Sequence, residues 1–422
     1  MMPVRPQKLA LGIDVGTSGV RIAAVDNEGQ TRALSTHAFA AGEERSSPAA
    51  WWRGVEACFK ALAGQIDLRD VGAVAVDGTS GTVLALDESL SPLGRALMYD
   101  EACPDPKIVA SLDSVAPENS PARGLYSALA RAAYLARKHD AFRVVHQADW
   151  IAMQLGAPVT SDENNALKTG YDLDSREWPA WIAGLDLDPK VLPEVLPAGS
   201  VIGPVCDKAA SLGLPPSAVI VSGTTDGCAS FLATGAGDVG EGVTALGSTL
   251  VLKLLSDRRI DAPAYGIYSH RIAGVWLAGG ASNTGGAVIR HFFTDEDLPQ
   301  LTARLNPEQP TRLDYYPLLR PGERFPVNDP DLQPKLEPRP ADDAVFFQAL
   351  LEGIAAVEEQ GYRRLKQLGA PALKSVRSVG GGAVNAAWTR IRQRKLGVPF
   401  LPAASTEAAV GTALLAWKAV AK

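Results

Sequence analysis

Apolar runs that end in short glycine-containing turns recur along the chain. The first run, 9–13, ends in Asp14, turns through GTSG (16–19) and continues as a second apolar run to Val25. Two apolar strands around such a turn predict a β-hairpin. Its backbone N–H groups and hydroxyls, beside a carboxylate, suit a phosphate chain that carries a divalent cation. The pattern indicates an ATP-using enzyme, although a hairpin that binds nothing has the same pattern. The groups concerned are Asp14, Gly16, Thr17 and Ser18.

Three further turns of similar composition follow predicted strands. Each places glycine with threonine or serine directly after an apolar run, and two of them also involve an aspartate. One such turn is explained by chain reversal alone, whereas four of them, spread over both halves of the chain, favour a shared ligand-binding role. The three turns are 78–81, which follows Asp77, then 223–227, which contains Asp226, and 247–249 between the apolar runs of 243–255.

The spacing of apolar residues predicts a mixed sheet flanked by helices in the first half of the chain. Strands are expected at 8–13, 20–25 and 31–39, and helical periodicity extends over 48–66, before the strand that ends in Asp77. A meander followed by a helix and another strand is typical of a layered α/β domain. A ribonuclease-H-like core has this order of elements.

The segment 99–216 is expected to be mostly helical, with proline-rich connections. Its polar clusters 147–150 and 161–170 carry side chains that are able to hydrogen-bond a polyhydroxylated ligand. A capped helix start would produce the same polar sequence near residue 161. We favour the ligand interpretation slightly.

The strand-and-turn pattern restarts after residue 234. The glycine-rich segment 380–385 lies between a predicted strand and a predicted helix, so its backbone and the helix N-terminus are able to face a nucleotide. Asn385 and Trp388 would then contact the base, while burial in the core explains Trp388 equally well. The literal GxGxxG at 235–240 follows a helix and precedes a strand, which is the wrong order for a dinucleotide fingerprint. The expected elements are strands at 242–255, 264–270, 275–278 and 375–379, an extended loop at 315–339, and helices at 344–368, 386–396 and from Glu407 onward.

Length and charge narrow the class of protein. A chain of 422 residues exceeds a single core, and we expect domains at 1–233 and 234–406, with a helix at 407–422 that packs back on the first domain. The net charge of −6 argues against a nucleic-acid partner, which would need clustered basic residues. The densest basic run, 390–395, is expected to form the solvated face of a helix.

Targeting and cysteine patterns suggest a cytoplasmic location. No apolar run approaches the ~20 residues that a membrane span needs, and the first residues show no signal-peptide pattern. The four cysteines are far apart, which argues against a structural zinc site and a disulfide framework. We expect no membrane partner.

Five segments, in this order and spacing, resemble the FGGY carbohydrate kinases of the actin, hexokinase and heat-shock-protein superfamily. The resemblance covers essentially the whole chain and looks closest to the short D-ribulose kinases of cyanobacteria and plants. Strings such as VDGTSGTVLAL, GGASNTGGA, LDYYPL, GERFP and RQRKLGVP are similar to theirs. The five segments are 11–22, 76–84, 222–227, 246–252 and 379–388.

This resemblance implies two ribonuclease-H-like domains around a hinge cleft, with ATP, Mg²⁺ and a small sugar as ligands. D-ribulose is the favoured sugar, D-xylulose or another sugar or polyol is the alternative, and an actin-like nucleotide switch without a sugar site is less favoured. The resemblance leaves a homodimer open. It implies that Asp226 is the catalytic base, that Asp14 holds the metal, that Asp14, Ser80 and Asp226 contact the sugar, that Gly16, Thr17, Ser18, Gly247, Ser248 and Thr249 hold phosphates, and that Gly381, Gly382, Asn385 and Trp388 bound the adenine.

One departure from the family pattern concerns the sugar pocket. Many FGGY kinases carry a Lys-x-x-Trp element in the helix expected at 125–138, whereas this chain has LARAAY at 129–134. The departure affects the expected identity of the sugar more than the phosphoryl chemistry.

Overall fold

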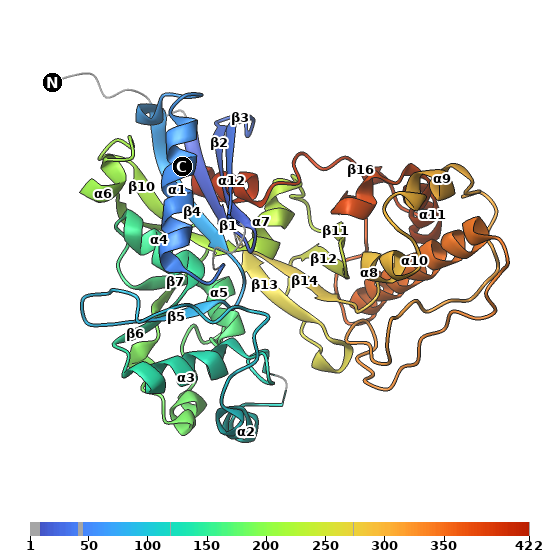
Figure 1. Cartoon of the computed structure of the whole chain (residues 1–422), viewed down its shortest axis with the longest axis horizontal. Helices are drawn as coiled ribbons and strands as arrows, with labels where there is room; N and C mark the ends of the chain where they lie inside the picture. Colours follow the sequence, from blue (N-terminus) through green and yellow to red (C-terminus); the bar gives the residue numbers. More distant parts are fainter. Residues whose placement is uncertain (1–8, 41–44, 119, 273, 422) are drawn as a thin grey trace. The chain divides into compact units, whose positions relative to one another are not determined.

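A computed structural model describes residues 9–40, 45–118, 120–272 and 274–421. The chain forms two compact α/β units, and each contains one large mixed sheet with helices packed against it (Figure 1). Residue 8, at the start of the first predicted strand, lies outside the described residues. The first unit comprises Met1–Ala233, Arg271–Ala273 and Glu407–Lys422, and the second comprises Thr234–His270 and Gly274–Thr406.

The first unit is built on a six-stranded sheet in the order β3-β2-β1-β4-β10-β9. β1 pairs antiparallel with β2 and parallel with β4, so the predicted meander is confirmed, with strand ends that differ by one or two residues. The strands are β1 (Leu9–Val15), β2 (Gly19–Asp26), β3 (Thr31–Ala38), β4 (Val71–Gly78), β9 (Val201–Pro204) and β10 (Val219–Thr225).

The two faces of this sheet bury side chains of different size. Large residues of β1 such as Leu11 pack against Trp51 of helix α1 (Pro48–Leu62). On the opposite face, Ala10 packs with alanines of helix α12 (Ala408–Val420) (Figure 1). A Cβ atom at Gly12 would lie 2.0 Å from the carbonyl oxygen of Ala409. Glycine and alanine therefore let the last helix lie directly on the centre of the sheet.

The middle segment is less helical than its sequence predicts. Several short strands occur within 99–216, and β9 is an edge strand of the main sheet. The helix that begins at Pro48 ends at Leu62, four residues earlier than expected, since the chain turns at 63–65. The remaining elements of this unit are β5 (Val83–Leu86), β6 (Arg143–His146), β7 (Thr160–Asp162), β8 (Glu194–Leu196), α2 (Pro106–Val115), α3 (Ala128–His139), α4 (Gln147–Leu155), α5 (Glu163–Lys168), α6 (Asp207–Ala210) and α7 (Asp226–Ala233).

The turn expected at 223–227 does not exist. β10 continues to Thr225, and α7 begins at Asp226 without an intervening loop. A Cβ atom at Gly223 would lie 1.7 Å from the carbonyl oxygen of Val76, beside a shift in the register between β10 and β4. Glycine at this position therefore allows two strands to approach closely at a bulge, rather than a reversal of the chain.

The second unit has a six-stranded sheet in the order β13-β14-β12-β11-β15-β16. β11 and β12 form the predicted hairpin around 247–249. The first half of the strand predicted at 264–270 is instead a short 3₁₀ turn, Pro263–Tyr265. The strands are β11 (Glu241–Leu246), β12 (Leu250–Ser256), β13 (Tyr268–Ile272), β14 (Val275–Ala281), β15 (Ser375–Val379) and β16 (Phe400–Leu401), and the helices are α8 (Gly286–Phe292), α9 (Asp297–Ala303), α10 (Asp343–Gln367) and α11 (Ala386–Leu396).

The basic run of α11 is not wholly solvated, contrary to the prediction. Arg392 is fully buried, and its guanidinium donates to both carboxylate oxygens of Glu358 on α10, at 2.6 and 2.7 Å. A buried arginine needs such a partner because an unpaired charge in the core is costly. Among the described residues, no helix has the length and apolarity to cross a membrane.

Candidate active site

Three carboxylates of the first unit lie where parallel strands end. Asp14 of β1 and Asp77 of β4 are register partners, and Thr224 of β10 is the next partner of Asp77. Asp226 follows the end of β10 and opens α7. Ligands of open α/β sheets bind outside the carboxyl ends of such strands. Asp14 and Asp226 were expected as site residues, whereas Asp77 was noted only as the residue before a second GTSG turn, 78–81, and was given no role.

Burial dominates the electrostatics of Asp14, whose residue is 6% exposed. Burial raises the pKa of Asp14 to about 6; Arg21 opposes this rise, while the charge of Asp226 adds to it. The Nη1 atom of Arg21 lies 3.5 Å from Oδ2 of Asp14. The carboxylate is thus held between one cation and further negative charge, an arrangement that favours an added cation.

Asp77 is fully buried beneath the same edge of the sheet. Its Oδ2 accepts a hydrogen bond from the hydroxyl of Thr412 on α12, and its Oδ1 has no hydrogen-bond partner among the described residues. Burial raises the pKa of Asp77 well above its usual value, and the neighbouring charge of Asp14 adds to the rise. The last helix of the chain therefore supplies part of this site.

Asp226 is half-buried at the first position of α7. Its Oδ1 accepts a hydrogen bond from the backbone N–H of Gly227 at 2.6 Å. The N-terminus of a helix stabilises a negative charge. The carboxylate of Asp226 therefore lies at a helix N-terminus, directly after the end of β10.

The turn that carries Ser80 is fixed by buried hydrogen bonds. The backbone N–H and the hydroxyl of Thr79 donate to Oε1 of Gln147 at 3.0 and 2.7 Å. The guanidinium of Arg131, from the segment that departs from the family pattern, donates to the carbonyl oxygen of Gly81 at 2.7 Å. The hydroxyl of Ser80 is buried and has no partner within the described part of the chain. A buried polar group without a partner is typical of a ligand or water site.

The capped helix start near residue 161 is confirmed, whereas the ligand interpretation of the cluster 147–150 stays a prediction. Asp162 caps α5, accepting the backbone N–H groups of Asn164 and Asn165 at 2.9 and 3.0 Å. Buried His146 contacts the carboxylate of Asp149 at 2.8 Å, as well as two hydroxyls. These hydrogen bonds satisfy buried polar groups within the fold. In contrast, Nε2 of Gln147 and Nε1 of Trp150 are buried and have no hydrogen-bond partner among the described residues.

The hairpin turn between β1 and β2 offers fewer groups than its sequence indicates. The backbone N–H of Gly16 donates to the carbonyl oxygen of Gly19 at 3.0 Å, and the carbonyl oxygen of Ser18 accepts from Phe39. Thr17 is half-buried and Ser18 is exposed. Gly16 thus shapes the turn, while the two hydroxyls are accessible to a ligand.

The turn 247–249 of the second unit presents its N–H groups in one direction. The backbone N–H groups of Gly286 and Ala287, in the first turn of α8, donate to the carbonyl oxygens of Gly247 and Ser248 at 2.8 and 3.0 Å. In a trans peptide, the N–H points opposite to the C=O. The N–H groups of Ser248 and Thr249 therefore point away from α8. Ser248 is exposed and its two neighbours are half-buried, so the turn is able to hold a phosphate.

A cavity of about 310 Å³ lies beside the glycine-rich segment of the second unit. Trp388 is buried against Gly382, and its indole N–H donates to the carbonyl oxygen of Leu351 at 3.1 Å. Asn385 caps α11 by accepting the N–H of Trp388 at 3.0 Å. The core interpretation of Trp388 is confirmed, and contact with a base stays a prediction, although the residue also lines the cavity. The lining comprises Ile289, Asp295, Leu298, Pro299, Thr302, Phe347, Leu351, Gly381, Gly382, Val384, Asn385 and Trp388.

The donor set of the first unit fits Mg²⁺ bound together with a substrate. Within the ranges that the structure describes, no group of three or more His, Cys, Asp or Glu side chains could hold a metal by itself. Mg²⁺ in phosphoryl-transfer enzymes is usually held by one or two carboxylates plus substrate phosphates and water. Asp14 and Asp77 supply carboxylate oxygens of this kind.

The two units each carry one mixed sheet and one set of candidate ligand-binding groups. Residues 9–106 match the N-terminal domain, and residues 243–420 the C-terminal domain, of the FGGY family of carbohydrate kinases. The chain belongs to this family, whose members are ATP-dependent sugar phosphotransferases that use Mg²⁺.

Similar proteins include several kinases of a five-carbon ketose. The chain is 24% identical over 287 residues to a xylulose kinase of Klebsiella pneumoniae, covering 63% of this chain but only 59% of that protein. It is 22% identical over 417 residues to a xylulose kinase of Escherichia coli (strain K12), covering 90% and 83%. The solved structure of a xylulose kinase from Rhodospirillum rubrum shares the fold, with a TM-score of 0.83, 24% identity and coverage of 97% and 89%.

Proposed function

We propose that this protein transfers the γ-phosphate of ATP to a pentulose, and that D-ribulose is the preferred acceptor. The observation that carries the proposal is the alignment of Asp14, Asp77 and Asp226 at the ends of β1, β4 and β10. Phosphoryl transfer needs a carboxylate that accepts the proton of the attacking hydroxyl and groups that orient the phosphates. The first unit supplies the carboxylates, and each unit supplies a hydroxyl-bearing turn.

Asp226 is the proposed catalytic base. Its carboxylate accepts the proton of the sugar hydroxyl, while the partly exposed Asp226 side chain stays accessible at the start of α7. Asp14, with Asp77 behind it, holds Mg²⁺. When bound, Mg²⁺ neutralises negative charge on the phosphates of ATP. Thr17, Ser18, Ser248 and Thr249 donate hydrogen bonds to these phosphates.

The sugar is oriented by directional hydrogen bonds from Ser80 and Asp14. The hydroxyl of Ser80 is buried without a partner among the described residues, and the hydrogen bonds of the neighbouring Thr79 fix its turn, so this hydroxyl is able to select one sugar hydroxyl. ATP places its base against Trp388 in the 310 Å³ cavity of the second unit. Asn385 positions this wall by capping α11.

The choice of a pentulose is supported by the names of the relatives, two of which are xylulose kinases. The choice of D-ribulose is supported by the sequence strings that resemble D-ribulose kinases, including the segment that carries Ser80. D-ribulose and D-xylulose differ at one stereocentre, so D-xylulose is the second candidate. Loss of one directional hydrogen bond costs ~1–3 kcal/mol, which predicts a roughly ten- to hundredfold preference in kcat/KM.

Steady-state ADP release across a panel of pentuloses, other sugars and polyols tests the proposal. We expect the highest kcat/KM with D-ribulose and release of ribulose 5-phosphate, identified by mass spectrometry. A preference for D-xylulose would replace the substrate and leave the kinase activity intact. ATP hydrolysis that no tested sugar stimulates would instead favour the actin-like nucleotide switch.

A further inference from the structure

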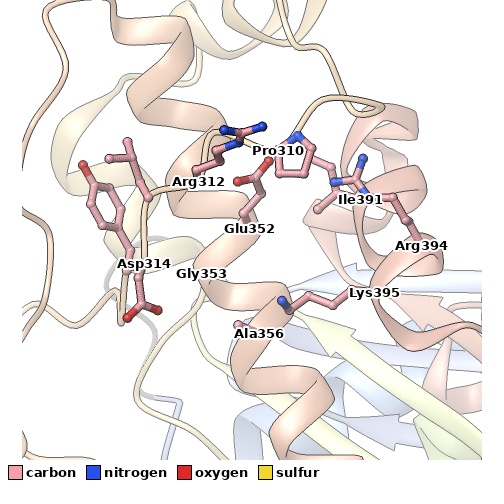
Figure 2. Close-up of a pocket in the computed structure, with 11 residues that line it drawn as sticks. Pro310, Arg312, Asp314, Glu352, Gly353, Ala356, Ile391, Arg394 and Lys395 are labelled. Carbon is pink, nitrogen blue, oxygen red and sulfur yellow. The ribbon is translucent and has the colours of Figure 1, made fainter.

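We propose that a second cavity of the second unit is a regulatory site for a small phosphate ester. The cavity has a volume of about 400 Å³ and lies between α10, α11 and the loop 310–315 (Figure 2). Small-molecule sites commonly have volumes of ~300–1,000 Å³. Its lining comprises Pro310, Arg312, Leu313, Asp314, Tyr315, Glu352, Gly353, Ala356, Ile391, Arg394 and Lys395.

Positive charge converges on this cavity from two sides. Arg312 comes from the loop, and Arg394 and Lys395 come from α11, as Figure 2 shows. Arg312 is exposed and has no hydrogen bond or ion pair with any other described residue. The guanidinium of Arg394 donates to the backbone carbonyl of Pro307, which leaves its charge uncompensated. Lys395 makes one loose ion pair, with Nζ 3.7 Å from Oε2 of Glu359.

The two carboxylates of the lining are already engaged. Glu352 accepts the backbone N–H and the hydroxyl of Thr311, the latter at 2.6 Å, and the side-chain amide of Gln348 at 2.9 Å. Asp314 pairs with Lys335. Glu352 keeps its negative charge because its donors are neutral, whereas Lys335 balances the charge of Asp314. Arg312 and Arg394 have no ion pair with any described residue, so positive charge remains in excess around the cavity. A phosphate, with its three acceptor oxygens, matches this excess.

Hydrogen bonds hold the loop that leads to Arg312 in one conformation. The amide of Gln348 is buried and binds the backbone of Asn306 and Gln309 at 2.8–3.0 Å. Arg312 itself has a φ of 62°, a left-handed conformation that is unfavourable for a side-chain-bearing residue. Such conformations persist where the surroundings hold them and are frequent at functional sites. The fixed loop aims a cation over the apolar floor formed by Gly353, Ala356 and Ile391.

The floor and walls fit an ester with an organic body better than a bare oxyanion. Ile391 and Gly353 are buried, and Ala356 is half-buried, so they offer contact to a carbon skeleton beside the cations. The body of the ligand would cover this floor while its phosphate meets Arg312 and Lys395. We therefore assign a phosphorylated metabolite rather than free phosphate.

The same two helices connect this site to the proposed nucleotide cavity. α10 contributes Leu351 to the nucleotide cavity and the adjacent Glu352 to the second cavity. α11 contributes Trp388 to the former and Ile391, one turn later, to the latter. A ligand that shifts these helices would change the affinity for ATP, and the coupling must be reciprocal. This part of the inference rests on the nucleotide role of Trp388 in the proposed function.

Titration calorimetry of the full chain, saturated with a non-hydrolysable ATP analogue, tests the site without any turnover. The probes are D-glucose 6-phosphate and inorganic phosphate, at about 0.15 M ionic strength to screen weak surface attraction. Arg312→Gly removes the cation while glycine accepts the left-handed backbone. Arg390→Ala removes a cation from the same surface of α11 outside the cavity, and Lys395→Ala is a second test inside it.

We expect D-glucose 6-phosphate to bind the wild type and Arg390→Ala equally. Arg312→Gly and Lys395→Ala should each weaken this binding roughly ten- to hundredfold, the usual effect of losing a charged hydrogen bond. Equal affinity in Arg312→Gly and the wild type, or equal losses in Arg390→Ala and Arg312→Gly, would overturn the site. Inorganic phosphate that binds as tightly as the ester would overturn the assignment to an ester.

The regulatory role is measured separately, by titrating the ATP analogue with and without D-glucose 6-phosphate. We expect the ester to change the affinity for the analogue in the wild type and not in Arg312→Gly. Analogue affinity that is unchanged by the ester in the wild type would overturn the regulatory role. Neither titration depends on a sugar substrate, so failure of the pentulose assignment leaves both results interpretable.

Discussion

The candidate ligand sites of the two units are made of different chemical groups. The first unit uses carboxylate side chains, of which Asp14 and Asp77 are buried and have raised pKa values. The second unit uses backbone and glycine around the turn 247–249. A Cβ atom at Gly285 or Gly286 would lie 2.7–2.8 Å from the backbone of that turn. One site depends on charge, and the other depends on the absence of side chains.

Because of this difference, substitutions at the site of the first unit should change activity and stability in opposite directions. Substitutions at the site of the second unit should change ligand affinity and stability in the same direction. A buried carboxylate with a raised pKa lowers the stability of the folded state at neutral pH, so neutral substitutions there should stabilise the protein while they remove activity. The glycine-rich site and its Trp388 wall are continuous with the packed core. Substitutions there should reduce ligand affinity and stability together.

The largest expected effect concerns Asp226. Asp226→Asn removes the proposed proton acceptor, and we expect kcat for sugar phosphorylation to fall by about 10²–10⁴-fold, as is typical of a general base. Affinity for ATP, measured by calorimetry, should stay at the wild-type value, because Asp226 is not among the residues proposed to hold ATP or Mg²⁺. Near-normal turnover of Asp226→Asn would contradict the assignment of the base.

Trp388 tests the second unit. Trp388→Ala should lower the free energy of unfolding by ~3–5 kcal/mol, because it leaves a large cavity in the core. It should also weaken ATP more than the sugar. Chemical denaturation and the two KM values provide the measurements.

Trp388→Phe is the matched control, because it keeps an aromatic ring while it loses the hydrogen bond to Leu351 and part of the volume of the indole. We expect it to retain most of the affinity for ATP. Equal loss of affinity for ATP and sugar in Trp388→Ala would show that the residue acts through packing alone.

Substitution of Asp14 is expected to change stability in the opposite direction, that is, to raise it. Its folded-state pKa of about 6 lies above the ordinary value of 3.8, so the ionised form is disfavoured in the folded protein at higher pH. Above pH 6 the wild type should therefore lose about 3 kcal/mol of stability relative to a neutral side chain. Asp14→Asn should be more stable than the wild type at pH 8, and the difference should vanish as the pH falls from 6 toward 4. Its kinase activity should be lost.

Asp26 is the control for the direction of this change in stability. It is also buried in the first unit, where burial opposes ionisation, but hydrogen bonds from Gln30, Arg32 and Glu28 outweigh burial and lower its pKa. Asp26→Asn should therefore destabilise the protein at pH 8. Urea denaturation of both variants across this pH range decides the comparison, and a loss of stability in Asp14→Asn at pH 8 would contradict it.

Local patterns in the sequence predicted those parts of the fold that local interactions determine. The hairpins around 16–19 and 247–249 and the helix Ala386–Leu396 agree with the structure because apolar spacing and turn residues act within one element. Gly223 was misinterpreted because its role depends on the carbonyl of Val76, more than 140 residues earlier in the chain. The buried pair of Arg392 and Glu358 escaped prediction for the same reason.

The candidate site was likewise predictable only where local interactions determine it. Asp14 and Asp226 were expected at it, but the hydrogen bond that Asp77 accepts from Thr412 of the last helix is a contact that no local pattern reveals. The polar cluster near Asp162 looked like a ligand site because a sequence shows donors and acceptors without their partners. Its partners became visible only when β7, α4 and α5 were placed together.

Substitution of Ser80 is expected to have the smallest effect on activity. It also tests whether a site residue of the first unit can be changed without loss of stability. Its buried hydroxyl has no partner among the described residues, so Ser80→Ala removes no hydrogen bond within the chain and should leave the melting temperature unchanged. In the complex, the same substitution should remove one directional bond to the sugar, which raises the KM for the sugar roughly tenfold at ~1.4 kcal/mol per factor of ten. The preference for D-ribulose over D-xylulose should shrink with it. Thr79→Ser is the control, because it keeps the hydroxyl that donates to Gln147. A Ser80→Ala variant with unaltered kcat/KM for both sugars would place the selecting group elsewhere in the first unit.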